Sequence, residues 1–237
     1  MKNKLADIDK TLLMGPGPSS VSPNVYKAIS TYTVGHLDKR FLDLMDDVKS
    51  MLRRTLKTDN DLTLPVSGTG TAAMESCFVN LIEKEDKVLV IENGYFGLRM
   101  IDMCKRLSAD VDTLNFEWGK PIIIETVKEK LKNNKYKIVA VVHAETSTGV
   151  RNPVKEISSY LDEETIFIVD AVTSLGTIEL NVDAWGIDAV YSCSQKGLSC
   201  PPGASPVSFS PKAMNKILER KSTVPNFYLD MQQIIKY

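Results

Sequence analysis

The sequence lacks long hydrophobic runs and an excess of charge of either sign. No apolar run approaches the roughly 20 residues that a membrane-spanning helix needs, and the first ten residues, MKNKLADIDK, lack the apolar core of a secretory signal. The 29 basic and 30 acidic residues give a net charge of −1, and the two signs are interspersed. We therefore expect no membrane span and no surface that binds nucleic acid through its charge.

Histidine and cysteine are also scarce, which limits metal and disulfide chemistry. The two histidines, His36 and His143, lie far apart, and no HExxH motif or Cys/His cluster could form a metal site. No two of the four cysteines form a CxxC pair, and none has a spacing that indicates a nucleophile with a paired base. We predict no metal site and interpret the cysteines as reduced thiols of a cytoplasmic protein.

The 237 residues, 43% of them hydrophobic and 25% charged, have the composition of a soluble globular protein. Prolines and glycines alternate in MGPGPSS (14–20), which excludes a helix, so we expect residues 1–20 to form an extended arm. No repeat or linker interrupts the remainder. We therefore expect residues 21–237 to form one large domain.

Strand and helix patterns alternate along this domain. Helices are predicted at 22–30, 41–56, 71–82, 124–132 and 154–161, after NGYFG (93–97), and in NFYLDMQQIIKY (226–237). Buried strands are predicted at 62–68, 87–92, 137–144, 165–172 and 188–194. Continuous Val/Ile-rich strands separated by helices predict an α/β fold, with a mostly parallel central sheet and helices on both faces.

The segment SGTGT (67–71) joins a predicted strand to a predicted helix. Its glycines allow the backbone to approach an anion, and the free N–H groups at the helix start, with two threonine hydroxyls, could hold a phosphate. A strand-to-helix turn also requires glycine and a hydroxyl for purely local reasons, so both interpretations stay open here. The segment is not a GxxxxGK[ST] loop, which argues against nucleoside triphosphate hydrolysis.

Asp170 and Lys196 follow two further predicted strands. Asp170 ends the apolar run TIFIVD, where a buried carboxylate needs a cationic partner, although it could also cap the next helix. Lys196 follows DAVYSCS, where a lysine removed from bulk water can attack an aldehyde, although most lysines in loops are simply solvated. Ligands of open α/β sheets bind at the carboxyl ends of strands, so one crevice could collect SGTGT, Asp170 and Lys196.

In this order, GPGPSSVSP, SGTGT, NGYFG, HAETSTGV, VDAVTSLG, YSCSQKGLSCPPG and FYLD resemble the class V aminotransferases, within the fold-type I pyridoxal-phosphate enzymes. The likeness is greatest to the alanine–glyoxylate and serine–pyruvate aminotransferase group. It covers nearly the whole chain and implies the large domain of these enzymes with pyridoxal 5′-phosphate as cofactor.

The resemblance also implies residue roles. Lys196 would form the Schiff base and carry the proton between the substrate Cα and the cofactor C4′. Asp170 would pair with the pyridine nitrogen, while Val172 packs on one ring face and Phe96 on the other. That last position is often tryptophan in the family, and Phe96 could equally be an ordinary core aromatic.

The remaining implied cofactor contacts concern its phosphate and its phenolic oxygen. Thr69, Gly70 and Thr71 would bind the phosphate, assisted by Gln195. Ser147 would contact the phenolic oxygen, although it could be an ordinary turn residue. His143 is interpreted as a hydrogen-bonded histidine at a strand end rather than as a catalytic base.

The implied reaction moves an amino group from alanine or serine to a 2-oxo acid, glyoxylate or pyruvate. Aminoethylphosphonate–pyruvate transaminase is an alternative, as is a truncated, catalytically impaired cofactor-binding fragment. A cysteine desulfurase usually has histidine before its lysine, where Gln195 stands here.

The resemblance finally implies what surrounds this chain. The small C-terminal domain of the family, which carries the arginine for the substrate carboxylate, is expected to be absent from these 237 residues. A homodimer is also implied, with residues 41–56 as part of the contact.

Overall fold

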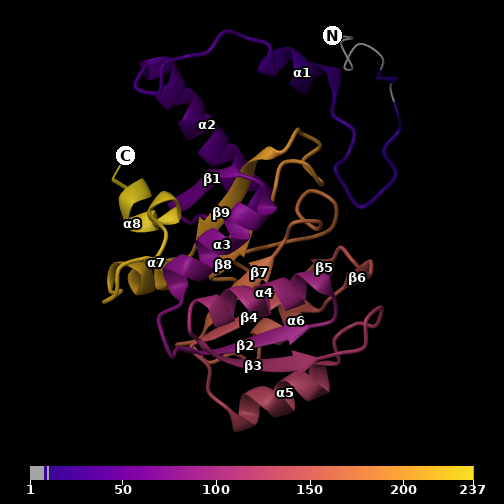
Figure 1. The fold of residues 1–237 in the computed structure, drawn as a ribbon, viewed down its shortest axis with the longest axis vertical. Helices are drawn as coiled ribbons and strands as arrows, with labels where there is room; N and C mark the ends of the chain where they lie inside the picture. Colours follow the sequence, from indigo (N-terminus) through magenta and orange to yellow (C-terminus); the bar gives the residue numbers. More distant parts are fainter. Residues whose placement is uncertain (1–7, 10, 237) are drawn as a thin grey trace.

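The computed structural model describes residues 8, 9 and 11–236, so residues 1–7 and 10 of the predicted arm, and Tyr237, lie outside the described residues. Figure 1 shows a central sheet in the strand order β1-β9-β8-β7-β4-β2-β3. Its strands are β1 (Leu62–Gly68), β2 (Lys87–Glu92), β3 (Asp110–Asn115), β4 (Ile138–Val142), β7 (Ile166–Asp170), β8 (Ala189–Tyr191) and β9 (Gly203–Phe209); a separate small pair comprises β5 (Ala144–Glu145) and β6 (Val150–Arg151).

The predicted mostly parallel sheet is confirmed. Only β9 runs against its neighbours, and it lies between β1 and β8, so β1 points in the same direction as β8, β7, β4, β2 and β3. The carboxyl ends of all these strands therefore meet at one edge of the sheet, which is where ligands of such sheets bind.

Eight α-helices and one 3₁₀ helix, η1, occur among the described residues. They are α1 (Pro23–Ile29), α2 (Lys39–Leu56), α3 (Gly70–Leu81), α4 (Tyr95–Arg106), α5 (Ile124–Asn133), α6 (Val154–Ser158), α7 (Pro211–Leu218), η1 (Phe227–Leu229) and α8 (Met231–Ile234). The boundaries agree closely with the predictions for α1, α3 and α5, whereas α6 and β8 are shorter than predicted. No helix of the described chain is long and apolar enough to cross a membrane.

Helices cover both faces of the sheet, as predicted, because the strand side chains alternate between two cores. Val88 and Val90 of β2 point into the core that contains α3, α4 and α7, while Leu89 and Ile91 point into the core that contains α5 and α6. All four side chains are fully or almost fully buried. The two cores hold the parallel strands rigidly beneath the carboxyl edge.

The prediction of one continuous helix over 226–237 is wrong for the described residues. Asp230 leaves the helical conformation between η1 and α8, and its carboxylate accepts a hydrogen bond from the Gln232 amide at 2.9 Å. Asp230 therefore starts a new short helix rather than continuing the preceding turn.

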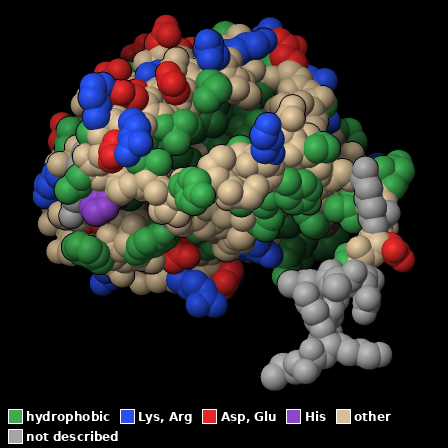
Figure 2. Space-filling model, turned by 90° about the horizontal axis from the view of Figure 1, so that it is seen from above, with side chains coloured by type: hydrophobic (Ala, Val, Ile, Leu, Met, Phe, Trp, Pro, Cys, Tyr) green, Lys and Arg blue, Asp and Glu red, His purple; other side chains and the backbone are tan. Residues whose placement is uncertain are grey.

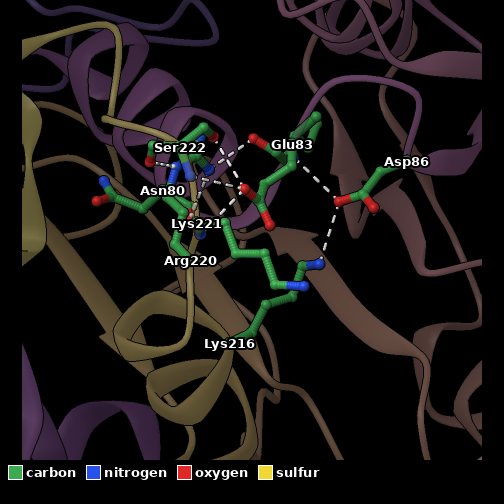
Figure 3. Close-up of polar contacts among 8 residues, drawn as sticks. Asn80, Glu83, Asp86, Lys216, Arg220, Lys221 and Ser222 are labelled. Carbon is green, nitrogen blue, oxygen red and sulfur yellow. Dashed lines mark hydrogen bonds and ion pairs between the residues drawn. The ribbon is translucent and has the colours of Figure 1, made fainter.

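The segment after α7 is tied to the carboxyl end of α3 (Figure 3). The Arg220 guanidinium donates to the carbonyls of Asn80 and Ile82 at 3.2 and 2.6 Å, which satisfies groups that a helix end leaves unpaired. Glu83 accepts from the Ser222 hydroxyl at 2.8 Å and from two backbone amides. Burial raises the pKa of Glu83, but these hydrogen bonds and the Arg220 charge outweigh burial and leave the pKa below its usual value.

Candidate active site

Every candidate residue lies at or just beyond the carboxyl end of one of five strands. These strands are β1, β2, β4, β7 and β8, and all five run in the same direction. The sequence therefore brings the candidate residues to one edge although they are distributed over more than 120 positions of the chain.

The turn after β1 leads into the amino end of α3. Thr69 is the N-cap residue, yet its side chain makes no capping hydrogen bond. Within the described chain, the amides of Gly70 and Thr71 have no protein acceptor. The preceding carbonyls are held away, because the Tyr228 hydroxyl donates to Ser67 O and the Ser205 hydroxyl donates to Gly68 O, each at 2.9 Å. This helix end is open to an anion.

Gly70 brings the open helix end against two other strand ends. A Cβ atom at Gly70 would lie 3.2 Å from Val172 Cγ2 and 3.3 Å from Cys193 Cβ, so a larger side chain would push the helix away. Val172 follows β7 and Cys193 follows β8. The structure thus places Gly70 and Val172, two of the predicted cofactor-binding residues, in direct proximity.

Asp170 ends β7 and is buried, with 2% of its surface exposed. Its Oδ1 accepts from the Val172 amide at 2.8 Å, which is the local capping role, whereas its buried Oδ2 has no partner among the described residues. Burial raises the pKa of Asp170 to about 7, against the lowering effect of the Val172 amide. An unpaired buried carboxylate oxygen is suited to a cationic partner.

Tyr191 is a buried neighbour of Asp170 that the sequence did not single out. The two residues are paired in register across β7 and β8. Burial and the adjacent carboxylate raise the pKa of Tyr191 well above its usual value. The hydroxyl lowers the pKa of Asp170, although neither it nor Oδ2 has a partner of ordinary hydrogen-bond geometry.

Lys196 lies in the turn after β8 and is half-buried against the amino-terminal arm. Its Nζ donates to Pro16 O at 2.6 Å, and the Ser19 hydroxyl donates to the Lys196 carbonyl at 2.6 Å. Gly17, at a φ of 111°, packs so closely on the Lys196 stem that any side chain there would overlap it. The arm therefore fixes the direction of the lysine.

Lys196 also lines a cavity of about 460 Å³, together with Gly17, Thr146, Thr173 and Thr177. This volume lies within the usual range for small-molecule sites, about 300–1,000 Å³. None of the other predicted site residues lines it, so the cavity lies on the arm side of the lysine.

Phe96 and Ser147 are brought together by Glu145, which the sequence reading missed. The buried Glu145 carboxylate accepts from the Phe96 amide at 3.2 Å and the Gly97 amide at 3.4 Å at the start of α4. It also accepts from the Ser147 hydroxyl at 2.7 Å, while Ser147 Oγ accepts from the Tyr95 amide at 2.9 Å. The only hydroxyl proton of Ser147 is thus already donated within the protein.

Two further side chains near the site carry unpaired atoms. Buried Gln195 Oε1 has no partner among the described residues, which leaves one end of this amide available to a ligand. His143 is buried edge-to-face against Trp185, with ring centroids 5.5 Å apart, and its Nδ1 is also unpaired. Burial, and secondarily the Arg151 charge, lowers the pKa of His143 to about 4. The histidine expected to be hydrogen-bonded at a strand end is therefore buried, but its Nδ1 has no hydrogen-bond partner among the described residues.

Arg99 is the other site residue that the sequence reading missed. It lies on α4, and its guanidinium donates to Thr71 Oγ1 at 2.8 Å, which connects the start of α3 to the neighbouring helix. The HAETS and NGYFGLR segments contain Glu145 and Arg99, but neither residue type is diagnostic at a single position.

The open features of the site match the two ends of pyridoxal phosphate. The free amides of Gly70 and Thr71 suit its phosphate, and the unpaired Asp170 Oδ2 suits a protonated pyridine nitrogen. The close approach at Gly70 leaves the start of α3 near Val172, where a flat ring could pack. The residues present therefore fit this cofactor.

Comparisons with known proteins agree with the geometry. The family model "Aminotransferase class-V" matches residues 11–226. The sequence is 37% identical over 235 residues to the alanine–glyoxylate aminotransferase of Rattus norvegicus, a match that covers 99% of this chain and 57% of that protein.

Two crystal structures are similar over 98% of this chain. One is the alanine–glyoxylate aminotransferase from Nostoc sp., with a TM-score of 0.95 and 47% identity over 62% of its chain. The other is the ureidoglycine–glyoxylate aminotransferase from Bacillus subtilis, with a TM-score of 0.94 and 37% identity over 60% of its chain. The present chain thus spans about three-fifths of the length of these proteins.

Proposed function

The chain belongs to the class V aminotransferase family, and on that premise we propose that it is a pyridoxal-phosphate-dependent transaminase. The amino donor is a small amino acid, alanine or serine, and the acceptor is a 2-oxo acid, glyoxylate or pyruvate. The observation that carries the proposal is the arrangement of Lys196, the unpaired Asp170 Oδ2 and the open amino end of α3 at one edge of the sheet.

The binding residues divide between the two ends of the cofactor. Thr69, Gly70 and Thr71 hold the phosphate through backbone amides and hydroxyls, and the Gln195 amide assists them. Asp170 holds a proton on the pyridine nitrogen, and when bound the ring then acts as a sink for electrons released at the substrate Cα. Val172 and Phe96 pack on the two ring faces.

Ser147 takes a more limited role than the resemblance implied. Its hydroxyl proton is donated to Glu145, so toward the phenolic oxygen of the cofactor it has only an acceptor lone pair left. We propose that Ser147 contacts this oxygen only if the phenolic group carries the proton, or if the Glu145 contact is exchanged for it.

Lys196 is the proposed catalytic residue. Its amine would hold the cofactor through the cofactor aldehyde, and once released it would act as the base that takes a proton from the substrate Cα and returns it. Pro16 O and Ser19 hold this side chain and its backbone in the turn after β8. The cavity of about 460 Å³ beside Lys196 is the proposed place for the substrate.

The similarity to the Bacillus subtilis ureidoglycine–glyoxylate aminotransferase supports a second amino donor, (S)-ureidoglycine, with the same acceptor. Aminoethylphosphonate as amino donor with pyruvate as acceptor is a further substrate pair to be tested. The four free cysteines, at positions 77, 104, 193 and 200, support a reducing compartment such as the cytoplasm.

We propose a homodimer formed through the α1–α2 region. These helices lie at one end of the molecule (Figure 1), and Figure 2, which views that end, shows hydrophobic side chains on the surface. Four apolar side chains here are each 48–62% exposed: Tyr26, Ile29, Leu42 and Leu44. Monomeric proteins rarely expose several large apolar side chains in one region. Sedimentation equilibrium of the protein and of Leu42→Lys tests this, and a monomeric wild type would contradict it.

The experiment that tests the transaminase proposal is a cofactor titration followed by addition of substrates. Wild-type protein, Lys196→Ala and the exposed-lysine control Lys105→Ala are titrated with pyridoxal phosphate, and visible absorbance reports lysine-bound cofactor. Each donor is then added with its acceptor, and chromatography measures the new amino acid.

We expect the absorbance band in the wild type and in Lys105→Ala but not in Lys196→Ala, and conversion of alanine or serine. Absence of the band from the wild type would overturn the cofactor assignment. A band that no donor changes would overturn the transaminase activity and favour a cofactor-binding fragment.

A further inference from the structure

Arg99 lies on the second turn of α4, between the proposed ring-stacking and phosphate-binding residues. Its guanidinium carbon is 4.9 Å from the Phe96 ring centroid and 5.4 Å from that of Tyr95. The two rings themselves meet edge to face, with centroids 5.8 Å apart. Stacking on both rings restricts the direction in which the guanidinium can point.

That direction is toward Thr71, whose Oγ1 accepts from Arg99 Nη1 at 2.8 Å. A threonine hydroxyl has one proton and two acceptor lone pairs. Because one lone pair is occupied by a cationic donor, the hydroxyl proton of Thr71 is directed elsewhere and is polarised as a donor. Arg99 therefore makes Thr71 a better donor to an anion beside the start of α3.

The charge of Arg99 has no acidic partner within the described chain, where every ion pair involves other residues. The guanidinium is only partly exposed and lies beside a helix amino end, which carries partial positive charge itself. Two positive features without an ion-paired carboxylate favour a bound anion at this place. The charge of Arg99 also reaches the buried Asp170, whose pKa it lowers.

We propose that Arg99 is a positioning residue for the cofactor phosphate, acting through the hydroxyl of Thr71 and through its own charge. This inference rests on the proposed function, since the phosphate is that of pyridoxal phosphate. It assigns selectivity for the phosphorylated cofactor to a residue on α4, outside the SGTGT segment.

The test compares the dissociation constants of pyridoxal phosphate and of pyridoxal, which lacks the phosphate, by titration of the purified protein. Arg99→Gln should raise the dissociation constant of pyridoxal phosphate about tenfold, which is the effect of losing one charge-assisted hydrogen bond. The dissociation constant of pyridoxal should rise less than about twofold, since pyridoxal carries no phosphate. Arg106→Gln, an exposed arginine paired with Asp102 on the same helix, is the matched control and should change neither constant.

Arg99→Lys keeps the positive charge but lacks the planar guanidinium, and its affinity for pyridoxal phosphate should fall about threefold. This variant replaces Arg99→Gln in the test if Arg99→Gln fails to fold. In a Thr71→Val background, Arg99→Gln should have a smaller effect, because the two residues act as a pair. Equal losses for both ligands, or no loss for either, would overturn the inference while leaving the proposed function intact. A wild type that binds neither ligand would overturn both.

Discussion

The amino ends of α3 and α4 have the same origin but different surroundings. Each helix follows a parallel strand, and neither N-cap residue, Thr69 or Gly94, makes a side-chain capping bond. At α4 the buried carboxylate of Glu145 and the hydroxyl of Ser147 accept from the first three amides. At α3 the amides of Gly70 and Thr71 find no protein acceptor within the described chain.

One edge of the sheet thus provides both structural support and a place for a ligand. A buried helix end has to be satisfied, and the protein satisfies α4 with its own carboxylate. The hydrogen-bonded amino end of α4 fixes the backbone of Phe96, whereas the unpaired amides at the amino end of α3 can bind the anion of a ligand. Substitutions at α4 should therefore affect stability, and substitutions at α3 should affect cofactor affinity.

Among the substitutions, the largest loss of stability is expected from removal of Glu145. Glu145→Ala leaves the partly buried Phe96 amide, the buried Gly97 amide and the Ser147 hydroxyl without their acceptor, which should cost about 3 kcal/mol of unfolding free energy. Denaturant unfolding measures this. The variant Asp38→Ala, at the solvent-exposed N-cap of α2, should cost clearly less. Equal costs for the two variants would remove the distinction between the helix ends.

The next effect concerns Asp170 and its pH dependence. Its pKa of about 7 in the folded protein exceeds the ordinary 3.8 because of burial, so the folded protein retains a proton that the unfolded chain has released. Stability of the cofactor-free protein should therefore fall as pH rises between these values, by up to about 1.4 kcal/mol per pH unit, and level off above pH 7.

Asp170→Asn carries no titrating group and should lose this component of the pH dependence. Denaturant unfolding of both proteins at a series of pH values supplies the measurement. Parallel stability curves for the two proteins would show that Asp170 does not titrate as its burial implies.

A smaller effect on stability, with a clear effect on binding, is expected at the open end of α3. Thr71→Val should change the unfolding free energy by less than about 0.5 kcal/mol, because the hydroxyl is exposed, caps no helix amide and loses only the exposed hydrogen bond from Arg99. The dissociation constant of pyridoxal phosphate should rise about tenfold. A large loss of stability with unchanged affinity would reverse the assignment.

The smallest effect is expected for Tyr228→Phe. The variant loses the hydrogen bond to Ser67 O that holds a carbonyl away from the start of α3. Because Tyr228 is 61% exposed, affinity for the cofactor should fall only about twofold. Tyr32→Phe, at a fully exposed tyrosine, is the control and should change nothing. Titration of both variants decides whether the carbonyl contact contributes.

The central parallel strands were predictable because they are buried on both faces. Runs such as KVLVIE have no polar position between their two end residues, and the structure places all but the first of these residues in the interior. β3 was missed because DVDTLN alternates polar and apolar residues at a half-buried sheet edge. β9 was missed because Pro206 lies within it, where it pairs with Pro65 and its carbonyl accepts from the Ser192 amide at 2.9 Å.

The candidate site was predictable only as far as local motifs reach. SGTGT, Asp170 and Lys196 stand at strand ends, which the pattern of apolar runs indicates directly. Glu145 and Arg99 act across long sequence separations, 49 positions to the Phe96 amide and 28 to Thr71. No spacing rule connects such pairs before the helices are packed. The contact of the amino-terminal arm with Lys196, across 180 positions, is likewise a product of the tertiary fold.

The central claim is that the amine of Lys196 binds the cofactor, and the most direct test locates the attachment. The protein is mixed with pyridoxal phosphate, reduced with borohydride to make any lysine-bound cofactor permanent, digested, and mapped by mass spectrometry. The account predicts one dominant phosphopyridoxyl group, on Lys196, that excess inorganic phosphate diminishes by competing at the start of α3. Label spread over exposed lysines such as Lys84 and Lys105, with Lys196 unmodified, would contradict it.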